Sequence, residues 1–408
     1  MSDSVYWIWH QLLFGIGTRR AEMMLEYFGT PENILRDIEN GGHITSMLTE
    51  KENGDYKFAL TRAEEIKRRT LRKGCEIITP DHPLYPPLLH GINAKPSVLY
   101  VKGNLACLQG NLVIAMVGTR GYTDYGRDVG RKLAEEMAVC GVVIVSGLAQ
   151  GIDTICHAAA LKAGGKSVGI LGCGIDIDYP KGSSQLKRNL VNNGAVLSEY
   201  PLGTEPKATN FPMRNRLISG MSDGTVVVEA DLKSGSLLTG SHALEQNREL
   251  FAVPGSIFSF REQGTHKLIK EGAKLTESAL DIFEQFTYRN YPGFYPERFP
   301  YKADQHDKSP GTPKAPAPRQ KAVPLLPEPV ELAKRQPPAK IPTPPPGTLP
   351  EEISPAARAV YSLLGQEPKT VEQITVQSEL GTPKIQSALT QLEIYGLIKG
   401  HPGRRFSR

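Results

Sequence analysis

The stretch LVIAMVGTRGYTDYG, residues 112–126, sets the pattern that decides the fold. An apolar run comes first, small residues follow it, and a helical pattern comes next. Five later stretches repeat the order: VVIVSG (142–147), SVGILG (167–172), AVLSE (195–199), TVVVEA (225–230) and ELFAVPG (249–255). Such alternation is typical of a parallel sheet with helices on both faces. We therefore predict an α/β, Rossmann-like, doubly wound domain with a mostly parallel sheet over residues 73–290, with EIIT (76–79) and VLYVKG (98–103) as edge strands.

The residues before this domain have a helical pattern. VYWIWHQLLF (5–14) and TRRAEMMLEYF (18–28) are joined by the short turn Gly15-Ile16-Gly17. A helix, a glycine turn and a second helix resemble a helix-hairpin-helix or SAM-like unit. We predict such a domain over residues 1–72. Two interpretations of it stay open, a packing unit and a unit whose turn contacts phosphate.

The residues after this domain divide into a linker and a further domain. Fourteen of the 32 prolines lie between residues 301 and 350, mixed with lysine and alanine, so we predict a flexible Pro-rich linker over 291–350. Residues 351–408 have three short helical stretches, then a strand, a turn and a basic end. This order predicts a winged helix. Both a nucleic-acid partner and a protein partner remain open for it.

Composition limits the class of protein. A chain of 408 residues has room for two to four domains, and a net charge of +5 with a pI near 8.8 permits a nucleic-acid partner without requiring one. The cysteines have no CxxC spacing, so we expect neither a metal site nor a disulfide framework. The N-terminal residues lack a basic segment before an apolar one, and no apolar run has the length of a membrane span. We expect a cytoplasmic protein without a membrane partner.

The residues that directly follow the predicted strands are small or hydroxylic. In a parallel sheet these ends meet at one edge, where glycine amides, hydroxyls and helix N-termini form an anion-binding surface. The candidates are Gly118, Thr119, Arg120, Ser146, Gly147, Ser234, Gly235, Ser236 and Thr239. The alternative, that the glycines serve only tight turns and helix packing, explains any one loop but not all of them together.

The stretch NFPMRNRLISG, residues 210–220, adds positive charge to the same edge. Arg214, Asn215 and Arg216 are predicted to bind phosphate or a base, and Phe211 is a candidate for stacking on a base. Two alternatives stay open. Asn215 and one arginine face inward and brace the neighbouring loops, or Phe211 is a buried staple before the helix.

Three other sequence features suggest a cofactor site or a catalytic residue, but their spacing or their position along the chain does not support one. GTRGYTDYG lacks the GxGxxG spacing of a dinucleotide site, and the stretch around Lys166 precedes a strand although a P-loop must follow one. His157 lies inside a helical pattern without an evident catalytic partner, so we interpret it as a packing or hydrogen-bonding residue. These motifs therefore favour neither a dinucleotide site nor ATP hydrolysis, and we expect no cofactor.

The motifs together resemble the DprA/Smf family of DNA-processing proteins. They are VGTRGYTDYG, SGLAQGIDTICHAAAL, GGKSVGILGCGIDIDYP, LSEYPLGTEP, FPMRNRLISGMSDGTVVVEA, SGSLLTGSHALEQNRELFAVPG and GTHKLIKEGAKL. The resemblance implies a bacterial cytosolic protein that binds single-stranded DNA without catalysis and forms a homodimer. It also implies that the protein protects incoming DNA and loads RecA recombinase during natural transformation, with single-stranded DNA-binding protein as a further partner.

The resemblance also implies particular DNA contacts. The family's arginine after the first strand corresponds to Arg120, its lysine after a Tyr-Pro turn corresponds to Lys181, and its FPxRNR signature corresponds to residues 211–216. The chain departs from the family at Gln150, where a basic residue is common, and after Lys181, where asparagine often stands.

Two other classes of function remain as alternatives. Rossmann-like nucleotide hydrolases also hold phosphate at glycine-rich strand ends, and Glu199 and Glu229 follow strands where such an enzyme needs a carboxylate. A regulator that reads duplex DNA through its winged helix is the other alternative.

Overall fold

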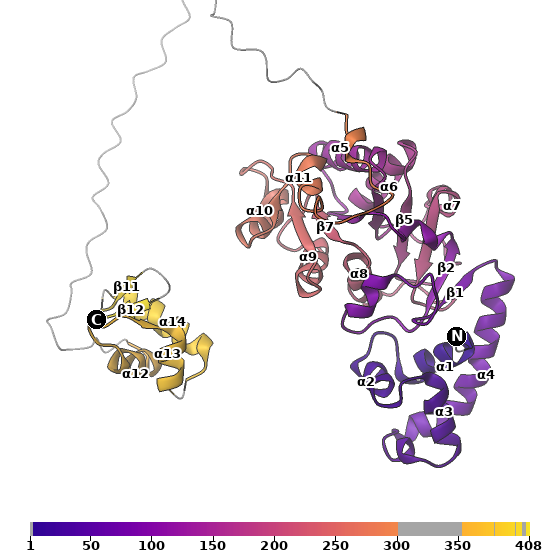
Figure 1. Cartoon of the computed structure of the whole chain (residues 1–408), viewed down its shortest axis with the longest axis horizontal. Coiled ribbons are helices and arrows are strands. Elements are labelled where there is room, and N and C mark those ends of the chain that lie inside the picture. The colour runs from indigo at the N-terminus through magenta and orange to yellow at the C-terminus, as the bar shows by residue number, and fades with distance from the viewer. Residues whose placement is uncertain (1–2, 301–352, 379, 396, 402–404) are drawn as a thin grey trace, which may run out of the picture. The chain divides into compact units, whose positions relative to one another are not determined.

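The structure is a computed structural model of the chain, and it describes residues 3–300 and 353–408 apart from 379, 396 and 402–404. The described residues form two compact units, and the division between the units falls inside 301–352. Most of the predicted linker therefore lies outside the described residues. Figure 1 shows the first unit as helices packed around a central sheet.

The first unit contains a nine-stranded sheet in the order β1-β2-β6-β5-β4-β3-β7-β8-β9. The six strands predicted from the apolar runs are present as β3 to β8 and pair in parallel. The two predicted edge strands are also present as β1 and β2, which pair antiparallel, but only β1 is at the edge, because β2 lies between β1 and β6. The other edge strand, β9, is parallel, and we did not predict it. The bounds are β1 Glu76–Ile78, β2 Leu99–Gly103, β3 Val113–Val117, β4 Val143–Ser146, β5 Ser167–Leu171, β6 Gly194–Ser198, β7 Gly224–Val227, β8 Glu249–Ala252 and β9 Lys274–Leu275.

Helices cover both faces of this sheet (Figure 1), and the side chains of β3 alternate between the two faces. Val113, Ala115 and Val117 pack into the core formed with α8, α9 and α10, while Ile114 and Met116 pack into the core formed with α5, α6 and α11. Both faces of the central strands are thus buried, which explains their continuous apolar sequence. The helices are α5 Asp124–Val139, α6 Ile152–Lys162, α7 Ser184–Asn192, α8 Asn210–Gly220, α9 Ser236–Glu245, α10 Gln263–Lys270 and α11 Ala279–Phe283, with 3-10 turns at Pro87–Gly91, Leu105–Leu108 and Phe260–Glu262.

The N-terminal residues form the predicted helical unit. It contains α1 Ser4–Phe14, α2 Arg19–Phe28, α3 Pro31–Glu39, a 3-10 turn at His43–Ser46 and α4 Glu50–Arg72. Gly15 and Gly17 take positive φ in the turn between α1 and α2, as the glycine spacing suggests. Threonine side chains cap the next three helices by accepting hydrogen bonds from backbone amides of the first turn.

The helical unit and the sheet share one hydrophobic core. Trp9 on α1 packs in the same cluster as Tyr100 on β2 and Leu202 after β6. Gln11 Nε2 donates to the carbonyl of Glu199 at 3.1 Å, and Tyr100 Oη donates to Gln11 Oε1 at 3.4 Å. These buried contacts fix the helices against the antiparallel edge of the sheet.

The folded part of the first unit extends beyond residue 290, where we placed the start of the linker. Tyr291, Phe294 and Phe299 pack against the core on the α5 side of the sheet, and Tyr291 Oη donates to Asp223 Oδ1 at 2.9 Å. A 3-10 turn at Pro296–Arg298 lies in this segment. The aromatic residues bury enough apolar area to hold this segment against the core. We placed the start of the linker from its proline content and did not take these aromatic residues into account.

The second unit has the helix and strand order of the predicted winged helix. It contains α12 Pro355–Leu363, β10 Lys369–Thr370, α13 Val371–Gln377, α14 Thr382–Ile394, β11 Lys399–His401 and β12 Arg405–Ser407. The three strands pair antiparallel in the order β10-β12-β11. Val360, Ile374, Ile385 and Leu392 lie in its core. No helix in the described parts of the chain is both long and apolar enough to span a membrane.

His157 on α6 has the packing and hydrogen-bonding role that the sequence indicates. It is fully buried, and its Nδ1 lies 2.7 Å from the Oγ of Ser167 on β5. That hydroxyl donates to the carbonyl of Ile144, so Nδ1 carries the imidazole proton and donates to Oγ. Burial lowers the pKa of His157 to about 3, and the charge of Arg214 acts in the same direction.

We expect His157 to make folding stability depend on pH. Because its folded pKa is lowered from about 6.5, the unfolded chain binds a proton between pH 6.5 and 3 that the folded chain does not, and stability falls as pH falls through this window. His157→Gln should reduce the slope of unfolding free energy against pH by up to about 1.4 kcal/mol per pH unit. Urea denaturation from pH 7.5 to 5 measures this, and equal slopes for the two proteins would contradict it. His10, whose pKa burial lowers to about 4, contributes the same sign in both proteins and so cancels in the comparison.

Candidate functional site

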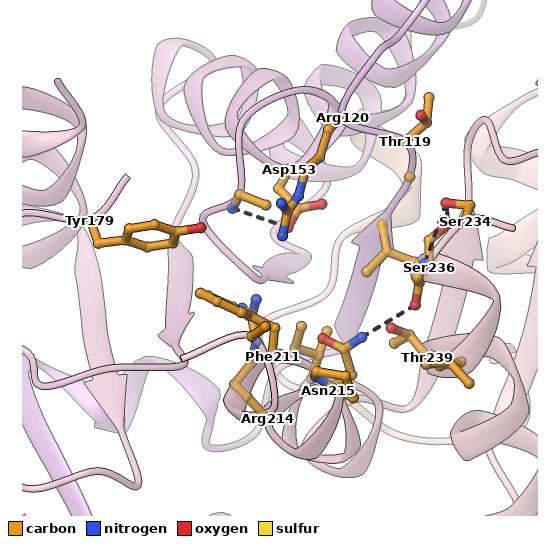
Figure 2. Close-up of a pocket in the computed structure, with 18 residues that line it drawn as sticks. Thr119, Arg120, Asp153, Tyr179, Phe211, Arg214, Asn215, Ser234, Ser236 and Thr239 are labelled. Atoms are coloured by element: carbon orange, nitrogen blue, oxygen red, sulfur yellow. Dashed lines mark hydrogen bonds between the residues drawn. The ribbon is translucent and has the colours of Figure 1, made fainter. Parts of the chain in front are cut away.

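A pocket of about 580 Å³ lies where the strand order of the sheet reverses. From β3 the chain proceeds to β4, β5 and β6 on one side, then returns to β7 on the other side of β3. The loops after β3 and β7 therefore diverge and leave a crevice at the carboxyl ends of the strands. The pocket is lined by Val117, Gly118, Thr119, Arg120, Ala149, Asp153, Tyr179, Ala208, Phe211, Pro212, Arg214, Asn215, Ile218, Ser234, Gly235, Ser236, Leu238 and Thr239 (Figure 2). We call it the switch-point pocket.

One wall of the switch-point pocket combines an exposed cation with two aromatic rings. The Arg120 guanidinium carbon lies 5.7 Å from the centroid of the Phe211 ring. The rings of Phe211 and Tyr179 lie 5.2 Å apart at an angle of 35°. Phe211 is partly exposed, so it is neither a fully buried staple nor a free surface ring. We did not predict Tyr179, although its place directly before the Pro180-Lys181 turn was a usable signal.

The opposite wall is neutral and polar. The hydroxyls of Ser234 and Ser236 lie 2.8 Å apart, and Asn215 Nδ2 donates to the carbonyl of Gly235 at 3.3 Å (Figure 2). Helix α9 begins at Ser236, whose amide donates to Ser234 Oγ at 3.4 Å, and the next amide, of Leu237, donates to the carbonyl of Ser234 at 3.1 Å. The hydroxyls of this loop are therefore the groups that can donate to an anion, and they lie at the positive end of the helix dipole.

Arg214 lies beneath the pocket instead of reaching out of it. Its side chain is buried, and Nη1 donates to the carbonyl of Ile170. Nε has no hydrogen-bond partner within the described chain. Burial raises the pKa of Asp153, and the Arg214 charge opposes that rise, so the two buried groups balance each other in part. Arg214 thus supplies a fixed positive charge under the pocket floor.

Gly147 and Ser146 serve the packing around Arg214. A Cβ on Gly147 would overlap the Arg214 guanidinium and the Asp153 carboxylate, and its amide donates to Asp153 Oδ2 at 3.1 Å. Ser146 is fully buried and donates to the carbonyl of Met116 at 2.6 Å. Neither lines the pocket, so the packing interpretation of glycine holds at this loop and we withdraw both residues from the candidate ligand contacts.

Arg216 also lies outside the pocket, on the far side of α8. It is 5% exposed and forms two 2.8 Å hydrogen bonds with the carboxylate of Glu199, which is 2% exposed. Further hydrogen bonds reach the carbonyls of Ala94 and Met213. Its donors are all engaged within the protein, so Arg216 is the inward-facing arginine of the alternative left open above. Lys181 is exposed and lies on the turn after Tyr179, but it does not line the pocket either.

The carboxylates considered for an enzyme do not face the pocket. Glu199 is paired with Arg216, and the fully buried Glu229 accepts hydrogen bonds from the amide and hydroxyl of Thr123 at 3.0 Å. Both carboxylates therefore hold structure in place. Within the part of the chain that the structure describes, no three His, Cys, Asp or Glu side chains gather as metal ligands would.

The fold and the pocket define a class of protein, Rossmann-like proteins with a crevice at the switch point of the sheet. Residues 76–287 match the family model described as DNA recombination-mediator protein A, and residues 342–404 match the DprA winged helix domain. The chain belongs to the DNA recombination-mediator protein A family. This membership confirms the resemblance drawn from the motifs and assigns the chain to DNA processing and recombination.

Individual relatives agree with this assignment. The chain is 32% identical over 423 residues to a Protein Smf from Synechocystis sp., covering 100% of this chain and 99% of the relative. It is 47% identical over 206 residues to the DNA processing protein DprA of Bacillus subtilis, covering 50% and 69% of the two chains. The X-ray structure of DprA from Streptococcus pneumoniae aligns with a TM-score of 0.58 at 34% identity and covers 71% of this chain and 100% of that chain.

The Glu199–Arg216 pair makes a measurable prediction. Arg216→Met would leave the Glu199 carboxylate buried without its charge partner, so we expect the free energy of unfolding to fall by about 3–5 kcal/mol. Urea denaturation checks this, with Arg131→Met as control because Arg131 is an exposed arginine whose loss should change stability by less than about 0.5 kcal/mol. Adding Glu199→Gln to Arg216→Met should restore part of the loss. Wild-type stability in Arg216→Met would show that the pair is not a structural requirement.

Proposed function

We propose that the chain binds single-stranded DNA in the switch-point pocket and acts as a recombination mediator without catalysis. The observation that carries the proposal is the wall made by Arg120, Phe211 and Tyr179 opposite the hydroxyls at the start of α9. An unstacked base can lie on the rings while its phosphate meets the cation or the hydroxyls. A duplex keeps its bases paired and stacked, so it cannot present one to this wall.

The proposed contacts divide into two kinds. Arg120, Lys181 and the buried charge of Arg214 attract phosphate, and the exposed position of Lys181 extends this charge beyond the pocket rim. The neutral groups that bind or position the strand are Gly118, Thr119, Asn215, Ser234, Gly235, Ser236 and Thr239. The absence of catalysis is supported by the structural roles of Glu199 and Glu229.

The cellular part of the proposal is supported by the family. We propose that the protein acts in the cytoplasm as a homodimer, protects incoming DNA and loads RecA during natural transformation, with single-stranded DNA-binding protein as a further partner. A dimer would engage one strand at two pockets and so gain avidity over a single pocket.

The first test is a gel shift with oligo-dT and a duplex of equal length. We expect the wild type to prefer oligo-dT, and Arg120→Ala with Lys181→Ala to lower affinity at least about tenfold because two phosphate contacts are lost. Lys162→Ala with Lys166→Ala is the matched control, since both lysines are exposed and lie before β5, at the other edge of the sheet.

Three outcomes would reject parts of this proposal. Preference for duplex, or an unaffected Arg120 and Lys181 double variant, would reject binding in the pocket. Release of base from a nucleoside monophosphate that is lost in Glu229→Gln would favour the hydrolase. Failure to form a slower band with both RecA and oligo-dT would reject the mediator step while leaving DNA binding intact.

The second test separates stacking from packing at Phe211. Phe211→Leu keeps an apolar side chain of similar size but removes the ring, so binding of oligo-dT should weaken by about 1–3 kcal/mol if the ring stacks on a base. Binding of an abasic oligomer of the same length, which offers phosphates alone, should not change. Fluorescence anisotropy measures both, and an equal loss for the two oligomers would assign Phe211 to packing.

A further inference from the structure

A second pocket, of about 390 Å³, lies where the end of α4, β2 and α7 meet. Its lining carries four basic side chains from three separate elements. The residues are Lys73, Cys75, Lys102, Ile175, Asp176, Ile177, Asp178, Ser184, Lys187 and Arg188, and we call it the lysine pocket.

The acidic residues of the lysine pocket are already engaged in the protein. Asp176 accepts a hydrogen bond from Arg69 Nη2 at 3.0 Å and one from the amide of Gly203 at 2.8 Å. Asp178 accepts from the hydroxyl of Ser184 at 2.9 Å. Asp176 is paired with Arg69, which is outside the pocket lining. Asp178 is hydrogen-bonded to a neutral hydroxyl and offsets part of the charge of Lys187. Four basic side chains against these two carboxylates leave the pocket with a net positive charge.

Two of the basic side chains are tied down and two are not. Lys187 Nζ donates to the carbonyl of Ile177 at 2.8 Å, and Arg188 Nη2 donates to Gln185 Oε1 at 2.7 Å. Lys73 and Lys102 are exposed, and neither forms a side-chain hydrogen bond or ion pair with the described residues. Both act electrostatically on the thiol of Cys75, where they oppose the rise in pKa that burial causes. The charge of Lys73, at the end of α4, and that of Lys102, on β2, thus both act on the buried thiol of Cys75.

A single chain segment connects the lysine pocket with the switch-point pocket. Tyr179 lines the switch-point pocket, while Asp178 and Ser184 line the lysine pocket. Lys181 lies between them on the exposed turn. No side chain caps the N-terminus of α7 at Ser184, so its first amides add positive potential at the same place.

From this arrangement we propose that the lysine pocket binds a backbone phosphate of the strand held in the switch-point pocket, with Lys73 and Lys102 as its ligands. The strand would leave the aromatic wall at Tyr179, pass Lys181 and reach the lysines at the junction of α4 and β2. This inference rests on the proposed function, and it assigns the end of α4, in the N-terminal helical unit, a direct part in DNA binding.

Binding of dT oligomers of two lengths tests the inference. We compare the wild type, Lys73→Ala with Lys102→Ala, and the control Lys162→Ala with Lys166→Ala, by fluorescence anisotropy at several salt concentrations. A short oligomer of about 4 nucleotides fills only the first pocket, whereas one of about 20 nucleotides spans both. The Lys73 and Lys102 variant should bind the long oligomer about tenfold more weakly, with a salt slope smaller by about 1.4, and bind the short one as the wild type does.

The outcomes separate this inference from the proposed function. If the wild type binds the long oligomer and the Lys73 and Lys102 variant binds it equally well, the lysine pocket is rejected and the switch-point pocket stands. An equal loss for both lengths, or the same loss in the control, means that net charge and not a second site is responsible, and also rejects it. If the wild type binds neither oligomer, the proposed function fails and this inference fails with it.

Discussion

The buried ion pair between Glu199 and Arg216 is the constraint on which the site depends. Glu199 follows β6 and Arg216 lies on α8, and the pair also holds the carbonyl of Ala94, while the backbone of Glu199 accepts a hydrogen bond from Gln11 on α1. Removing two charges from water is costly unless both are fully paired, so the folded chain must keep this pair formed. Keeping the pair formed fixes the rotation of α8 about its own axis. In that rotation the helix positions 211, 214, 215 and 218, which are spaced by three or four residues, face the pocket together.

A second buried group, Arg214 with Asp153, sets the electrostatics of the pocket floor. Arg214 reaches below the end of β5, and Gly147 leaves the room that its guanidinium needs. Asp153, which also lines the pocket, offsets part of the Arg214 charge, and salt screens the remainder less than it screens the charge of an exposed side chain. The exposed Arg120 then adds the contact that salt weakens. The pocket therefore combines the buried Arg214 with the exposed Arg120, whose charge salt screens and which lies over the Phe211 ring.

Much of the fold was predictable because burial on both faces leaves a strong apolar signal, and β3 to β8 all carry it. The antiparallel direction of β1 and β2 was not, since strand direction depends on where the helical unit packs and not on local sequence. For the site, the sequence placed Arg120 after a strand, Phe211 in the stretch 210–220 and Ser234 and Ser236 at a helix start, and the structure brings these residues together in one pocket. The sequence could not show which of Arg214 and Arg216 faces the pocket. Two residues two positions apart point to different sides of a helix, and the rotation of α8 is set by Glu199, which is distant in sequence. Tyr179 was missed although it directly precedes the Pro180-Lys181 turn, whereas Lys73 and Lys102 were missed because they converge only through tertiary packing.

Few free cations line the switch-point pocket, and this bears on the size of its ligand. Within the described pocket lining, Arg120 is the exposed cation, and the remaining attraction comes from buried charge, hydroxyls and rings. A mononucleotide would make one or two of these contacts. Their binding energy would be largely offset by the translational and rotational entropy that the ligand loses on binding, so its net affinity would be low. A polymer would make the proposed further contacts at Lys181 and at the lysine pocket with a smaller loss of freedom for each, because every following phosphate is already held near its site. The distribution of weak contacts along one segment of the chain, from Tyr179 to the start of α7, thus favours a strand over a single nucleotide.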